Sequence, residues 1–153
     1  MARCIDGMRK QEIGRKQSGN VQLGLRRVWP LELMERKQFV WYSLKYTDDM
    51  KDWQGGCARF WFIKIRPKYK DDVGLLEHEK VHVRQFWRLP FIHGIRYKFS
   101  EKYRLRCEVE AYREQLRWYP DTYTDWYRSC YAKSITEKYN LDIKIDKAIG
   151  LLR

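Results

Sequence analysis

Residues 75–89 read LLEHEKVHVRQFWRL, and apolar side chains recur in this stretch at the spacing of an α-helix. His78 and His82 are four residues apart, so they lie on the same face of that helix. Two imidazoles in this arrangement can reach one zinc ion, and Glu79 between them faces the water at the open coordination position. The motif H-E-x-x-H therefore predicts half of a catalytic zinc site.

A helical wheel places this motif on the face that points to the core. The same face carries Leu75, Phe86 and Leu89, and the opposite face carries Glu77, Lys80, Arg84 and Arg88. Two core histidines satisfied by hydrogen bonds would share this geometry. A third ligand from another element is what separates a metal site from that alternative.

The next long helical pattern, residues 103–118, offers a third ligand. Its apolar stripe consists of Leu105, Val109, Tyr112 and Leu116. Glu108 lies on the flank of this stripe, whereas Glu110 turns to the other side of the helix. A buried carboxylate needs a cation, a hydrogen-bond network or a metal. Glu108 could therefore be the third zinc ligand or one half of a salt bridge with a nearby base such as Arg104 or Lys102.

The rest of the chain predicts an α+β fold with a small N-terminal antiparallel sheet followed by a helical half. Strands are expected at 39–46 and 58–66, with loop residues between them and a short helix or turn at 31–37. Helices are expected at 75–88, 100–118 and 122–138, and a short one from Asp146.

The composition of the 153 residues suits one ordinary domain, which we assign to 28–153. Residues 1–27 are rich in basic residues and lack apolar periodicity, and they predict a flexible basic arm. The net charge of +12 favours polyanions such as nucleic acid or an anionic cell-wall polymer. The four cysteines are widely spaced and no apolar run could span a membrane, so we expect free thiols and a cytoplasmic location.

These motifs resemble those of the gluzincin class of zinc metallopeptidases, in particular the compact minigluzincin-like proteins of bacteria and their phages. In that class H-E-x-x-H on one helix is followed by a Glu on the next helix, in a context like E-x-x-A-D. The chain matches with His78, Glu79 and His82, followed by Glu108-Val109-Glu110-Ala111-Tyr112. Tyr112 stands where many members carry an Asp that orients a zinc-bound histidine, so other groups must provide that support.

The resemblance implies a zincin-like fold and a peptidase acting on a peptide or protein substrate in a bacterial or phage-infected cell. His78, His82 and Glu108 would hold Zn²⁺, and Glu79 would be the general base. The strand at 58–66 resembles the substrate-binding edge strand of the family. His93, Tyr97 and Tyr112 are alternative donors to the oxyanion.

Two other classes of function remain open. Basic residues of 84–106 alternate with aromatic ones, a mixture that can bind nucleic acid or, equally, form an ordinary protein surface. Alternatively, the zinc could be structural in a virion-associated or partner-binding protein. Glu79 favours catalysis over a structural site, because a structural zinc has no use for a general base.

Overall fold

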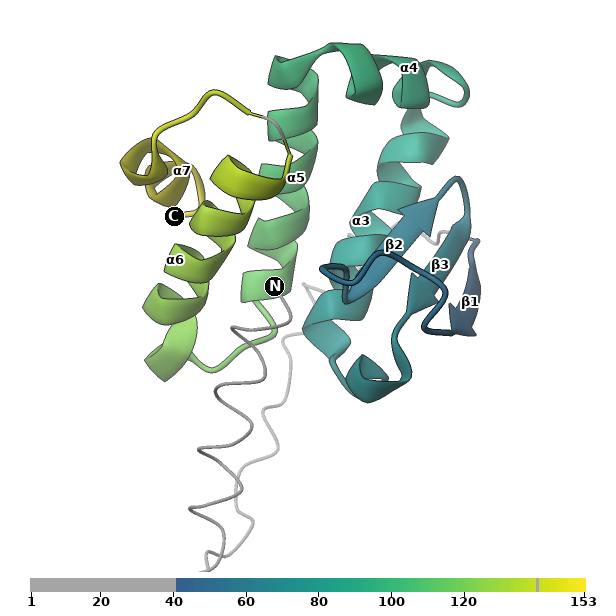
Figure 1. Cartoon of the computed structure of the whole chain (residues 1–153), viewed down its shortest axis with the longest axis horizontal. Helices are drawn as coiled ribbons and strands as arrows, with labels where there is room; N and C mark the ends of the chain where they lie inside the picture. Colours follow the sequence, from purple (N-terminus) through teal and green to yellow (C-terminus); the bar gives the residue numbers. More distant parts are fainter. Residues whose placement is uncertain (1–40, 140) are drawn as a thin grey trace, which may run out of the picture.

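The computed structural model of the chain describes residues 41–139 and 141–153 (Figure 1). The predicted basic arm at 1–27, the helix or turn predicted at 31–37 and the start of the strand predicted at 39–46 lie outside the described residues. The predicted α+β architecture is confirmed, because a small sheet precedes a helical half. Over 41–139 and 141–153, no helix combines the length and apolar character needed to cross a membrane.

The sheet has three short strands in the order β1-β3-β2. Their bounds are Ser43–Tyr46 for β1, Gly56–Arg59 for β2 and Phe62–Ile65 for β3. β2 pairs antiparallel with β3, but β1 pairs with β3 in parallel, so the expectation of a wholly antiparallel sheet is wrong. Because β3 is central, β2 forms one edge of the sheet.

The single strand predicted at 58–66 is in fact most of a hairpin. β2 and β3 are joined by the two residues Phe60 and Trp61, with Arg59 opposite Phe62. Phe60 has φ of 57°, which turns the chain tightly even though a bulky residue rarely adopts this conformation. The run of aromatic and β-branched residues hid the turn, since no Gly, Asn or Asp marks it.

The helical half contains five α-helices, preceded by a short 3₁₀ helix, η1, at Pro67–Tyr69. Their bounds are Val73–Arg88 for α3, Ile92–Phe99 for α4, Glu101–Leu116 for α5, Asp121–Lys138 for α6 and Ile145–Leu151 for α7. The predicted helices at 75–88, 100–118 and 122–138 and the one near Asp146 are confirmed as α3, α5, α6 and α7. The sequence analysis predicts no helix at the position of α4, which connects α3 to α5 (Figure 1).

Side-chain caps define the starts of the two helices that carry the candidate ligands. Asp72 accepts a hydrogen bond of 2.9 Å from the Leu75 N–H at the start of α3. Ser100 accepts one of 3.3 Å from the Tyr103 N–H at the start of α5. These caps satisfy amides that have no partner within the helix, so they set where each helix begins.

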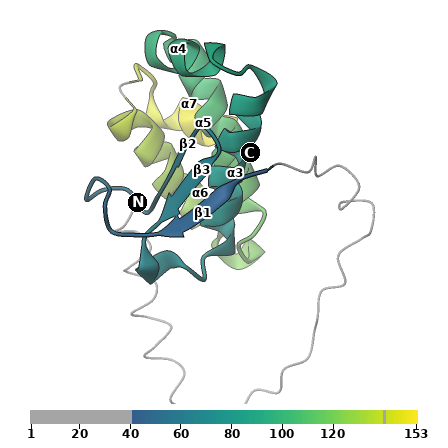
Figure 2. The ribbon, with the colours of Figure 1, turned by 90° about the vertical axis from the view of Figure 1, so that its right-hand side faces the viewer.

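Two apolar clusters surround a polar layer. The first joins the sheet to α3 (Figure 2) and consists of Ile63, Ile65, Tyr69, Leu75 and Val83. The second joins α5, α6 and α7, and it includes Val109, Tyr112, Leu116, Tyr131 and Ile135. α3 and α5 pack against each other between the clusters, and the candidate ligands lie where these two helices meet.

Packing on both sides makes α3 more buried than a surface helix. Glu77, predicted to face solvent, is only 5% exposed, and it pairs with Lys80 at 2.7 Å. The prediction of a polar outer face is therefore wrong at Glu77. The sheet on one side and α5 on the other leave too little of the helix surface for four exposed polar positions.

Candidate metal centre

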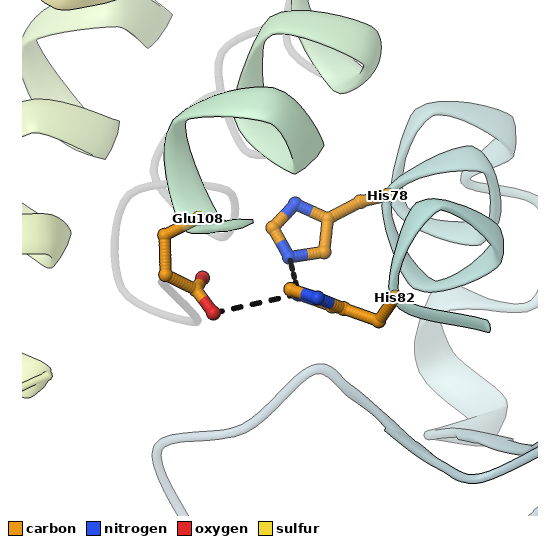
Figure 3. A group of neighbouring side chains, drawn as sticks. All are labelled: His78, His82 and Glu108. Carbon is orange, nitrogen blue, oxygen red and sulfur yellow. Dashed lines mark hydrogen bonds and ion pairs between the residues drawn. The ribbon is translucent and has the colours of Figure 1, made fainter. Parts of the chain in front are cut away.

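The three predicted ligands converge from α3 and α5 (Figure 3). His78 Nε2 lies 3.2 Å from His82 Nε2, and His82 Nε2 lies 3.5 Å from Glu108 Oε1. One ligand atom from each residue falls within 4.8 Å of the other two. The prediction that Glu108 faces inward on α5 is confirmed, since it is 1% exposed.

These separations suit a tetrahedral ion. Ligand bonds of about 2.0–2.1 Å at tetrahedral angles place neighbouring ligand atoms about 3.3 Å apart. The separations of 3.2 and 3.5 Å match two edges of such a tetrahedron. Two histidines and a carboxylate therefore form a cluster that could hold a metal ion.

A network from Gln85 determines the tautomer of His82. The Gln85 side-chain amide donates to the Cys107 carbonyl at 3.0 Å and to Glu110 at 3.0 Å, so its oxygen faces His82 Nδ1 at 2.9 Å. That oxygen can only accept, so Nδ1 carries the proton. In the neutral imidazole of His82 the lone pair is then on Nε2, which is the form a metal ligand requires.

Gln115 occupies the corresponding position beside His78. Burial and the charge of His82 lower the pKa of His78, the neighbouring Gln115 side chain raises it, and the net pKa is well below the ordinary value. His78 Nδ1 and Gln115 Oε1 are both buried and have no hydrogen-bond partner among the described residues. Gln115 in turn donates to Tyr119 at 2.8 Å, which anchors it.

Tyr112 does not orient a histidine by a hydrogen bond. Its ring packs edge-on against His78, with centroids 4.5 Å apart, and its hydroxyl lies 3.1 Å from that of Tyr139. Gln85 is thus the side chain that orients one of the two histidines by a hydrogen bond. Sequence reasoning missed it, although Gln85 follows His82 by three residues and so lies on a neighbouring face of the same helix.

The carboxylate of Glu108 is only half satisfied. Tyr97 donates a hydrogen bond of 2.5 Å to Oε1, while Oε2 is buried and has no hydrogen-bond partner among the described residues. Burial and the nearby Glu108 raise the pKa of Tyr97, so its phenol stays protonated as a donor. For His82, burial lowers the pKa, but Glu108 and Glu79 raise it by more, and the net pKa is above the ordinary value. A buried carboxylate with an unpartnered oxygen is a group that a cation would satisfy.

Glu79, the predicted general base, is buried between α3 and the edge strand. Burial raises its pKa, the charge of His82 lowers it, Glu108 raises it and a hydrogen bond with the Ala58 backbone lowers it, for a net value of about 7. Gly56 in β2 provides the space for this carboxylate, because a Cβ at position 56 would lie 2.7 Å from Glu79 Oε1. Nothing in the sequence pattern points to this role of Gly56.

The centre opens into a pocket of about 780 Å³. Its walls come from the loop before β2, from β2 itself and from α3, α4, α5 and the end of α6. β2 is the edge strand on this pocket, so the substrate strand predicted to pair with 58–66 would instead meet Gly56–Arg59. β3 lies in the middle of the sheet and cannot accept another strand.

The alternative oxyanion donors differ in their surroundings. Tyr97 is beside the ligands, whereas Tyr112 is 1% exposed and lies in the core. His93 lines the pocket, and its Nδ1 is 3.0 Å from the Tyr103 hydroxyl. Tyr97 is thus the candidate donor with a hydrogen bond to one of the predicted ligands.

Some of the basic residues of 84–106 have structural partners. Arg88 pairs with Glu110 at 2.8 Å, and Arg104 donates to the carbonyls of Tyr97, Lys98 and Tyr139. These contacts favour a structural use of both arginines over a dedicated nucleic-acid surface.

Comparison of the chain with protein-family models, with curated proteins and with solved structures finds no match. The chemistry of the side chains is therefore the basis for a functional proposal.

Proposed function

We propose that the protein is a zinc-dependent peptidase with a zincin-like fold. The observation that supports this most directly is the convergence of His78, His82 and Glu108 within 4.8 Å of one another, close to the buried side chain of Glu79. A bound zinc ion would polarise a scissile carbonyl and lower the pKa of a water molecule.

The residues of the chain would perform the proton transfers. Glu79 takes a proton from water as the water oxygen forms a bond to the carbonyl carbon. The C–N bond then breaks, and Glu79 passes the proton to the leaving amine. In the metal-free protein the pKa of Glu79 is about 7, near neutral pH, and the same group must accept and then release the proton. The edge of β2 would hold the substrate backbone as an added strand.

Metal analysis tests the ligand set. Protein purified without chelator should contain about one zinc per chain, and His78→Ala or Glu108→Gln should remove it. Two variants serve as controls: His93→Ala alters the remaining histidine of the chain, and Glu114→Gln alters a carboxylate of α5 that pairs with Arg117. Both controls should keep their zinc. Zinc-free wild-type protein, or zinc that persists in His78→Ala, would contradict the proposed site.

Peptide hydrolysis tests the activity. The zinc-loaded protein should cleave members of a peptide library, and Glu79→Gln should abolish cleavage while zinc content is unchanged. Cleavage that persists in Glu79→Gln would rule out Glu79 as the base. Zinc binding without cleavage of any peptide would favour a structural metal.

A further inference from the structure

The pocket wall around the metal centre carries charge of one sign. Five basic residues line it, and they come from five different parts of the chain: Lys51 precedes β2, Arg59 ends β2, and Lys98, Arg104 and Lys138 belong to α4, α5 and α6. Among the described residues that line the pocket, the acidic ones are Glu79 and Glu108, and both belong to the centre itself. Beyond the centre, the wall is therefore positive.

Among the described residues, four of these five cations have no carboxylate partner. Within 41–139 and 141–153, Lys51, Arg59, Lys98 and Lys138 form no ion pair with a carboxylate. Elsewhere Lys64 pairs with Asp49 at 3.0 Å, and other bases pair in the same way.

The three lysines of the pocket wall lie beside aromatic rings. Lys51 and Lys138 approach the same Trp53 ring, each with Nζ 5.9 Å from its centroid. Lys98 lies 5.3 Å from the centroid of Phe99. Such contacts contribute modestly and leave the positive charge uncompensated.

Uncompensated like charges around one concave site repel one another, and their fields add within it. The ion that we propose brings two further positive charges, which the carboxylates of Glu79 and Glu108 offset. The outer wall thus remains positive when the centre is loaded, and an anionic ligand would relieve the repulsion.

We infer that the pocket binds acidic peptide segments, with Asp or Glu side chains flanking the scissile bond. This inference rests on the proposed function, because it assigns the substrate class of the same site. A peptide fits better than a nucleic acid, since the cations surround a pocket that also contains the free edge of β2, which can pair with an extended backbone. Carboxylates spaced along a peptide could then reach lysines on opposite sides of the pocket.

Binding of labelled peptides, measured by fluorescence anisotropy, tests the inference separately from catalysis. The full chain carrying Glu79→Gln is used, so that the peptide is not cleaved. A Glu-rich peptide should bind about tenfold more tightly than the same peptide with Gln in place of Glu, as several pairs of modest strength would produce. Added salt should shrink this preference.

A pair of double variants locates the effect. Lys51→Gln with Lys138→Gln should reduce the preference to about twofold, because two of the wall charges are gone. Lys133→Gln with Lys147→Gln removes the same charge from residues that do not line the pocket, and it should leave the preference unchanged. Lys51 is exposed and Lys138 is half-buried, and circular dichroism checks that each variant is folded.

Equal binding of the Glu and Gln peptides would overturn the inference, and so would an equal loss in both double variants. Tighter binding of a single-stranded oligonucleotide through Lys51 and Lys138 would also overturn it, in favour of nucleic acid. Failure of the proposed function is distinguishable, since it appears as absent cleavage by the wild-type protein while the acidic preference persists.

Discussion

Gly56→Ala probes how the edge strand positions Glu79, the proposed general base. Gly56 lies in β2 against Glu79, and an added Cβ would be 2.7 Å from Oε1 and 3.1 Å from Cγ of that side chain. Ordinary contact begins at 3.4 Å, so the carboxylate must move by about 3.4 − 2.7 = 0.7 Å. Glu79 is 4% exposed, and neighbouring groups leave it little room to move without changing its direction.

The expected result is a loss of activity without a loss of metal. A displacement of this size in a catalytic group reduces kcat/KM by about 10- to 100-fold. Zinc content should stay at the wild-type level, because the three ligands belong to α3 and α5 and do not touch Gly56. Peptide hydrolysis and metal analysis of the same preparation measure both quantities.

Gly94→Ala is the matched control. Gly94 also lines the pocket, but a Cβ there would meet no atom within 4 Å. Since Gly94 lies inside α4, alanine should stabilise the helix by about 1 kcal/mol and leave activity unchanged. If Gly56→Ala hydrolyses peptides as well as Gly94→Ala does, β2 does not position the base and the reasoning is refuted.

Three further predictions concern the groups around the ligands. Gln85→Leu removes the acceptor that orients His82, so zinc affinity should fall by about 10- to 100-fold in competition with a chelating dye. An unchanged affinity would show that Gln85 does not determine the tautomer of His82. Tyr97→Phe removes the hydrogen bond on the buried Glu108, and urea unfolding of the zinc-free protein should show a loss of about 2 kcal/mol, whereas no change would mean that solvent replaces the phenol. The pKa of Glu79 is raised to about 7 in the folded state, so the ionised carboxylate opposes folding. Glu79→Gln should therefore stabilise the zinc-free protein by up to about 3 kcal/mol above pH 7. Below about pH 4 the substitution should have no effect, because the carboxyl is protonated in both the folded and the unfolded state. A stability difference that does not grow between these pH values in urea unfolding would contradict the raised pKa.

The sequence determined the helical half of the site. His78, Glu79 and His82 are near neighbours on one helix, and helix geometry alone places their side chains together. Glu108 was predictable because the apolar stripe of its own helix shows which face is buried. Both inferences depend on local periodicity, which the sequence records directly.

Only the tertiary structure decided what surrounds those residues. The space that Gly56 leaves for Glu79 and the cations that share the pocket depend on elements meeting from distant parts of the chain, which no local pattern encodes. Gln85 lies on the same helix as His82, so the sequence shows that the two residues are close. The orientation of the Gln85 amide, however, depends on its hydrogen bonds to Cys107 and Glu110 on α5. The sequence also did not predict the parallel pairing of β1 or the turn at Phe60. Tertiary packing can override the local preferences of residues for strands and turns.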